Sequence, residues 1–148
     1  MTRNIKVGTL ISVDSDELIA GMSGAYLPSA TLMERLELFV VRILHLVERE
    51  VVRNLAFLNR ALLREFYSFI LHLPDFKVIY EPVPDQYVKK QRALGLSKED
   101  SIIAGFTEWI GAKFLVTENR HFLKGYHSRS FEILDSNEFL KRLEIKSD

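Results

Sequence analysis

The chain has 148 residues, 47% of them hydrophobic and 27% charged, which predicts one folded domain over residues 1–148 and excludes a disordered chain. Its 20 basic residues balance 20 acidic ones, which argues against binding to nucleic acid by overall charge alone. It has no cysteine, so disulfides and thiolate zinc sites are excluded.

Targeting signals are absent from the sequence as given. The first residues lack the long apolar block of a signal peptide, and no apolar run reaches the length of a membrane span. We therefore expect a cytoplasmic protein with no membrane partner.

The first half of the chain alternates strand and helix signals. Ile5–Val13 is rich in β-branched residues and predicts a strand. Two short helices are expected at Glu17–Met22 and Ser29–Leu38, followed by a strand at Phe39–Leu46. Apolar residues three and four positions apart then predict one long helix, Glu48–Leu71.

Four arginines fall on the opposite face of this long helix, where they could grip an RNA backbone. A solvated helix face is the simpler interpretation. The four are Arg49, Arg53, Arg60 and Arg64.

The second half repeats the alternation. Three further strands are expected at Phe76–Tyr80, Lys113–Thr117 and Phe131–Leu134. The helices between and after them are Asp85–Leu94, then Ile102–Ile110 behind a Ser97 to Asp100 capping box, and Asn137–Leu143 with Ser136 as its cap.

Alternating strands and helices predict an α/β fold, a three-layer α/β/α sandwich around a parallel sheet of about five strands. We expect Ile5–Val13 and Lys113–Thr117 to be parallel neighbours in it. Ligands of such sheets bind beyond the carboxyl ends of the strands.

Acids and an amide from four separate segments are expected at that edge. Each has an alternative explanation, since Asp and Ser are common helix caps and acids favour first helical turns. The joint placement is what favours a functional site. The residues are Asp14 and Asp16 after the first strand, Glu48 and Glu50 in the first turn of the next long helix, Asp100, and Glu118 with Asn119 after the fourth strand.

Carboxylates gathered in one cleft repel each other unless a cation lies among them. Oxygen donors without cysteine favour a hard ion, Mg²⁺ or Mn²⁺. Such ions hold phosphate oxygens and activate water, so phosphodiester hydrolysis is the chemistry we expect.

The same segments resemble the PIN domain family, whose metal-dependent ribonucleases include VapC-like proteins. Ile11–Gly21 resembles its opening strand and first acid, and Glu50–Leu55 resembles the region of its second acid. Asp100–Ala104 and Gly111–Phe122 are similar to its C-terminal signature. The resemblance covers nearly the whole chain in the right order.

The resemblance implies a Mg²⁺- or Mn²⁺-dependent endoribonuclease that cuts single-stranded RNA. Asp14 would be the central metal ligand, Asp100 the second, and Glu50 would bind directly or through water. Asn119 occupies the place of a fourth acid. Glu48 or Asn54 could take the second position in place of Glu50.

Further residues are expected to bind substrate, including a basic run, Arg120–Arg129, that could form a phosphate-binding loop. The substrate-binding candidates are Ser15, Asp16, Thr117, Arg120, His121 and Lys124.

Other functions remain open. The fold could be a non-catalytic binding module, or the toxin of a toxin–antitoxin pair with an antitoxin-like partner, and a homodimer is expected. Asp14-Ser15-Asp16 also matches the DxD opening of haloacid-dehalogenase-type phosphatases, although no later strand ends in a paired-acid motif.

Overall fold

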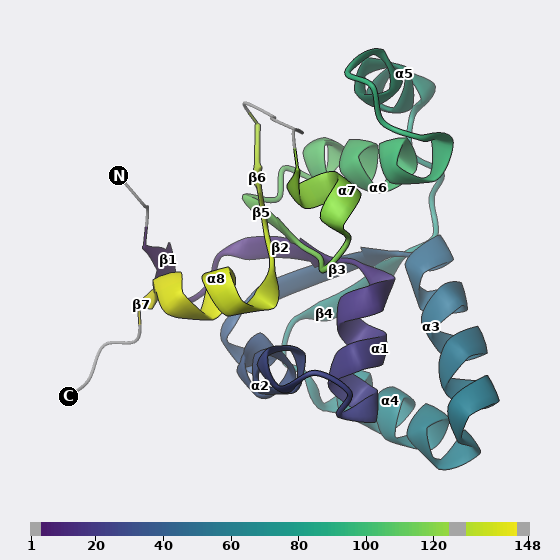
Figure 1. The fold of residues 1–148 in the computed structure, drawn as a ribbon, viewed down its shortest axis with the longest axis vertical. Coiled ribbons are helices and arrows are strands. Elements are labelled where there is room, and N and C mark those ends of the chain that lie inside the picture. The colour runs from purple at the N-terminus through teal and green to yellow at the C-terminus, as the bar shows by residue number, and fades with distance from the viewer. Residues whose placement is uncertain (1–3, 125–129, 145–148) are drawn as a thin grey trace.

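The central sheet of the protein has five strands, all parallel, in the order β4-β3-β2-β5-β6 (Figure 1). The computed structural model describes residues 4–124 and 130–144. In chain order the strands are β2 (Leu10–Val13), β3 (Val40–Leu44), β4 (Phe76–Ile79), β5 (Phe114–Val116) and β6 (Glu132–Leu134).

Eight α-helices are described around the sheet. Four lie in the first half of the chain: α1 (Ser15–Ser23), α2 (Leu27–Arg35), α3 (His45–Leu58) and α4 (Arg60–His72). The others are α5 (Asp85–Ala93), α6 (Lys98–Trp109), α7 (Arg120–Leu123) and α8 (Ser136–Arg142). A single 3-10 turn, η1 (Leu36–Leu38), follows α2. No helix in the described ranges combines the length and apolar character needed to cross a bilayer.

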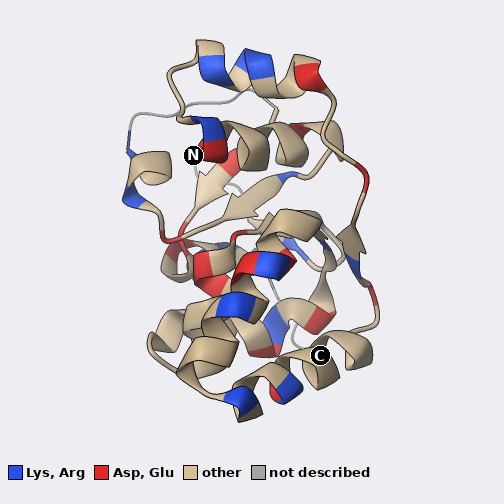
Figure 2. Ribbon diagram, turned by 90° about the vertical axis from the view of Figure 1, so that its right-hand side faces the viewer, with Lys and Arg blue, Asp and Glu red and all other residues tan. Residues whose placement is uncertain are grey.

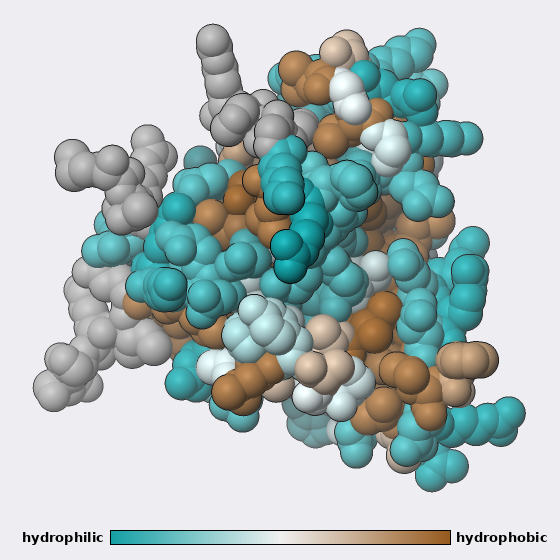
Figure 3. All heavy atoms as spheres, in the orientation of Figure 1, coloured by the Kyte–Doolittle hydropathy of each residue, from teal (hydrophilic) through white to brown (hydrophobic). Residues whose placement is uncertain are grey.

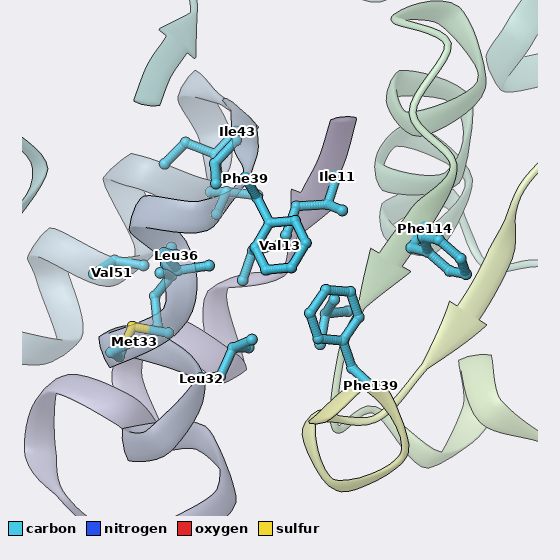
Figure 4. Packing of buried hydrophobic residues seen from close by; sticks show 14 of the residues in the cluster. Ile11, Val13, Leu32, Met33, Leu36, Phe39, Ile43, Val51, Phe114 and Phe139 are labelled. Atoms are coloured by element: carbon cyan, nitrogen blue, oxygen red, sulfur yellow. The ribbon is translucent and has the colours of Figure 1, made fainter. Parts of the chain in front are cut away.

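The two faces of the sheet carry separate hydrophobic clusters. Phe114 and Val116 of β5 join the main cluster, whereas Leu115 between them joins a second cluster with Ala104 of α6 and Phe122 of α7. Side chains alternate across a strand, so helices cover both faces and the three-layer fold is confirmed. In the main cluster, Phe139 packs edge-on against Phe39 at 5.2 Å and near Phe114 at 6.1 Å between ring centroids (Figure 4).

The predicted neighbours β2 and β5 are parallel and adjacent, as expected. Ile11 lies opposite Phe114 and Val13 opposite Val116. Both strands therefore end at the same edge of the sheet, and the segments that follow them meet there.

The expected strand Ile5–Val13 is wrong as one element. Gly8 adopts φ +91° and donates its N–H to Leu38 O at 2.7 Å, which turns the chain out of the strand. The part before the turn, β1 (Ile5–Lys6), pairs in parallel with β7 (Leu143–Glu144) in a separate two-stranded sheet.

The single helix Glu48–Leu71 is also wrong, because Asn59 breaks it into α3 and α4. Asn59 has an extended backbone, and its side-chain oxygen accepts the N–H of Ala61 at 2.9 Å, which caps α4. The four arginines therefore do not share one helical face: Arg49 and Arg53 lie on α3, and Arg60 and Arg64 on α4. All four are exposed.

The last helix is capped one residue earlier than expected. The Asp135 carboxylate accepts the N–H of Glu138 at 2.7 Å, and Ser136 is the buried first residue of α8. The remaining boundaries differ from the expectation by a few residues.

Candidate active site

Asp14 lies directly after β2 and is held by both neighbouring segments. Its backbone N–H donates to Val116 O at 3.0 Å, which ties it to the end of β5. Its Oδ1 accepts from the N–H of Ser15 at 2.8 Å, and its Oδ2 accepts from the Thr117 hydroxyl at 2.9 Å. Burial raises the pKa of Asp14, and Glu50 and Asp100 raise it further. The carboxylate is thus fixed, half-buried and in the field of two other acids.

Of the two glutamates expected at the second acid position, Glu50 is the one whose charge acts on Asp14. Because α3 begins at His45, Glu50 lies beyond its first turn, not within it as the sequence suggested. Glu50 acts on the pKa of Asp14, whereas Glu48 accepts the hydroxyl of Tyr80 at 3.3 Å. Asn54 donates to the backbone oxygen of Glu50 and stays one helical turn away. The structure brings Glu50 toward the site and directs Glu48 toward β4.

Asp100 comes to the site from the first turn of α6. Ser97 accepts the N–H of Asp100 at 3.2 Å, so the predicted capping contact forms. The Asn119 side-chain amide donates to Asp100 Oδ1 at 3.3 Å, while the Asn119 carbonyl oxygen caps α7 by accepting from His121 N–H at 3.0 Å. Asn119 therefore orients Asp100 and adds no charge.

Thr117 links the two central segments. It is fully buried at the end of β5, donates its hydroxyl to Asp14, and accepts the N–H of Asn119 at 3.0 Å. The same hydroxyl lies 3.4 Å from both oxygens of Asp16. Thr117 thus fixes the geometry of Asp14 from inside the protein.

A second group of acids contacts Asp16, and sequence reasoning missed one of its members, Glu17. Asp16 accepts the N–H of Glu118 at 3.2 Å, and burial together with Asp14 raises the pKa of Asp16 to about 7. Glu17 is fully buried and accepts the Ser29 hydroxyl at 2.7 Å. Burial raises the pKa of Glu17, and the neighbouring Glu118 carboxyl raises it further, which favours a proton on one of the two carboxyl groups. The available signal was the position of Glu17 beside Leu18 on the apolar side of α1.

Figure 2 shows acidic segments gathering at mid-height, between the upper and lower helices. Three basic candidates, Arg120, His121 and Lys124, are exposed on or after α7. Neither Arg120 nor Lys124 forms an ion pair with any described residue. Ser15 is buried and contributes its backbone N–H. Residues 125–129 of the expected phosphate-binding loop lie outside the described residues.

The donor chemistry of the site fits a hard cation. Asp14, Glu50 and Asp100 are oxygen donors, and none pairs with a described lysine or arginine. Within the described ranges, no three His, Asp or Glu side chains lie close enough to hold one ion by themselves. Mg²⁺ keeps several waters and is commonly held by one or two carboxylates, so it does not require three acids in direct contact.

The comparisons with known proteins show similarity in fold alone. No family model matches the sequence, and no curated protein matches it. A chain of the VapBC2 structure from Rickettsia felis, solved with a DNA fragment from its promoter, matches with a TM-score of 0.60 and 15% identity. That match covers 86% of this chain and 98% of the other. PAE2754 from Pyrobaculum aerophilum matches with a TM-score of 0.58 and 23% identity, over 90% and 94% of the two chains.

Both matches cover nearly the whole length of the other chain, so the likeness extends over the entire fold. The protein therefore has a PIN-like fold, with Asp14 directly after β2 at the carboxyl edge of the sheet.

Proposed function

We propose that the protein is a Mg²⁺- or Mn²⁺-dependent endoribonuclease acting on single-stranded RNA. The observation that carries the proposal is the state of Asp14. Its carboxylate is held by two hydrogen bonds, and burial together with two further acids, which have no ion-pair partners among the described residues, raises its pKa. Such an arrangement costs free energy unless a positive charge offsets it, and a cation supplies that charge.

Each residue at this edge has a distinct role in the proposal. Asp14 and Asp100 hold the ion directly, and Glu50 binds it through water. The ion would supply the Lewis acidity that polarises a phosphate and activates water for hydrolysis. Thr117 keeps Asp14 in its rotamer, and Asn119 does the same for Asp100.

Substrate binding is assigned to exposed groups beside the acids. Arg120 and Lys124 are unpaired cations in the described structure and suit RNA phosphates. His121 and Asp16 lie at the same rim. Because the chain has no net charge, this local pair of cations supplies the electrostatic attraction that overall composition does not.

The test is cleavage of a fluorogenic single-stranded RNA by purified wild-type protein and two variants, with Mg²⁺, Mn²⁺ or EDTA. Asp14→Asn keeps the shape and the capping oxygen but removes the charge, so we expect loss of cleavage and of Mn²⁺ binding with a metal-free Tm that does not fall. Asp75→Asn is the matched control. Asp75 pairs with Arg42 and lies just before β4, at the edge of the parallel sheet opposite to the one where Asp14 lies.

The outcomes separate the alternatives. Full activity of Asp14→Asn would make Asp14 only a helix cap. A wild-type protein that binds RNA without cutting it would be a non-catalytic module. A DxD phosphatase would release phosphate from a monoester substrate and leave RNA intact.

We also infer a protein partner of the antitoxin kind, together with a homodimer. The VapBC2 structure is a complex, and several large apolar side chains of this chain are exposed: Leu27 (76%), Phe57 (90%) and Leu71 (81%). In Figure 3, hydrophobic residues gather over the lower part of the face, around α1 and α4. Light scattering of the purified protein tests the dimer, and co-purification with the product of a neighbouring reading frame tests the partner.

A further inference from the structure

A cavity of about 590 Å³ opens beside the candidate active site. Its walls come from four parts of the chain: α1, the start of α2, the segment from β5 through α7, and the residue before α8. The polar and aromatic lining residues are Asp16, Tyr26, Glu118, Arg120, Lys124 and Asp135. The volume lies in the range of sites that hold small ligands.

The cavity borders the acids described above. Asp16 lines it, and the Thr117 hydroxyl contacts both Asp16 and Asp14. Glu118 reaches the cavity from the same turn, and its N–H fixes Asp16. A group bound in the cavity would therefore lie next to a phosphate bound at Asp14.

The lining carries two chemically different kinds of charged group. Arg120 and Lys124 are exposed and form no ion pair with a described residue, so they can attract an anion. Asp16, Glu118 and Asp135 are carboxylates. Asp135 uses one oxygen to accept Glu138 N–H, which fixes its side chain, and a carboxylate retains further acceptor positions.

Tyr26 gives the cavity an aromatic wall. Its side chain is 42% exposed at the N-terminal cap position of α2, although it makes no capping hydrogen bond there. Unpaired RNA bases stack on such rings and form hydrogen bonds through their edges. A nucleotide has an anionic phosphate, a flat ring and N–H donors, which match the three kinds of lining group.

We propose that this cavity binds the nucleotide flanking the cleaved phosphodiester bond, with its base on Tyr26 and its phosphate on Arg120 and Lys124. This inference rests on the proposed ribonuclease function and adds a base preference. Guanine offers two adjacent N–H donors to a carboxylate, whereas uracil offers one N–H between two carbonyl oxygens that a carboxylate repels. Guanine is therefore preferred over uracil at this position.

The experiment compares four short RNAs that differ only at one flanking base. Cleavage is followed as kcat and KM, and binding in EDTA is followed by fluorescence anisotropy. Tyr26→Ala should weaken binding by about tenfold and raise KM, while Tyr26→Phe, which keeps the ring, should match the wild type. Asp135→Asn, which retains the capping oxygen, should reduce the preference for guanine over uracil.

The test of the phosphate contact uses Lys124→Ala together with a matched control variant. Lys124→Ala should weaken binding of all four RNAs alike, because a phosphate contact carries no base information. Lys113→Ala removes an exposed lysine that directly precedes β5, at the opposite edge of the sheet, and should change nothing.

The two proposals fail separately. Normal cleavage with no effect of Tyr26→Ala overturns the cavity assignment and leaves the ribonuclease standing. Binding in EDTA that depends on Tyr26 and Lys124, without cleavage in any metal, overturns the ribonuclease and supports the cavity. A wild-type protein that neither binds nor cleaves these RNAs overturns both.

Discussion

The side-chain amide of Asn119 donates a hydrogen bond to Oδ1 of Asp100 at 3.3 Å. The carbonyl oxygen of the same amide accepts from the backbone of His121. The two contacts fix which end of Asn119 faces the acid. The position that resembles a fourth acid thus presents a donor to Asp100 instead of a second negative charge.

Replacing this donor by an acceptor should strengthen metal binding. Asn119→Asp keeps the oxygen that caps α7 but sets a carboxylate against Asp100, and cation affinity rises with the charge of the ligands. We expect Mn²⁺ affinity to increase about tenfold by calorimetry and the metal-free Tm to fall. An unchanged affinity would mean that Asn119 does not limit the ion.

Thr117 offers a test of positioning. Thr117→Val removes the hydroxyl that donates to Asp14 and leaves the N–H of Asn119 without its acceptor, at a cost of about 1–3 kcal/mol in unfolding free energy. Mn²⁺ affinity and kcat should fall together. Thr117→Ser retains the hydroxyl and should recover most of both, so a valine variant with full affinity would contradict the role.

The buried pair of Glu17 and Glu118 predicts a pH dependence of stability. Burial and the hydrogen bond with Glu118 raise the pKa of Glu17 to about 10. Between the unfolded pKa and this value the folded state holds a proton that the unfolded state has released. Stability contributed by Glu17 is therefore full at low pH and is lost as pH rises, by up to about 1.4 kcal/mol per pH unit.

Glu17→Gln keeps the acceptor for Ser29 and removes the titration. Denaturant unfolding in EDTA from pH 6 to 9 should give a shallower loss of stability for this variant than for the wild type. Glu65→Gln, at an exposed position of α4, serves as the control and should retain the wild-type slope. If the unfolding free energies of Glu17→Gln and of the wild type fall equally with pH, Glu17 does not hold a proton in the folded state.

Phe139 tests the core separately from the site. It is fully buried between Phe39 and Phe114, and truncation to alanine should cost about 3–5 kcal/mol. Protein that remains folded at low temperature should bind Mn²⁺ normally. Loss of Mn²⁺ binding at full folding would instead mean that this cluster positions the acids.

Sequence patterns predicted the layers, the β2–β5 pairing and the convergence of Asp14, Asp100 and Asn119. The strand and helix patterns can be read from neighbouring residues, and parallel strands end at the same edge of a sheet. They failed where a single residue overrides a continuing pattern. The three- and four-residue spacing runs through Asn59, yet its extended backbone and cap divide the helix.

Tertiary contacts explain the other gaps. The backbone turns at Gly8 because the Gly8 N–H donates a hydrogen bond to the carbonyl oxygen of Leu38, which lies 30 residues further along the chain. The pairing of Glu17 with Glu118 joins α1 to the turn after β5, and no periodicity within either segment encodes it. The orientation of Glu50 relative to Glu48 likewise depends on where α3 begins.

The hydrogen bond between Thr117 and Asp14 joins residues 103 positions apart, through two strands that are adjacent in space. During synthesis on the ribosome, Asp14 is made 103 residues before the threonine that orients it, and Asn119 follows that threonine. A nascent chain therefore lacks the assembled acids until β5 has docked beside β2. In the ribonuclease proposed above, this order of assembly delays activity until β5 has docked beside β2.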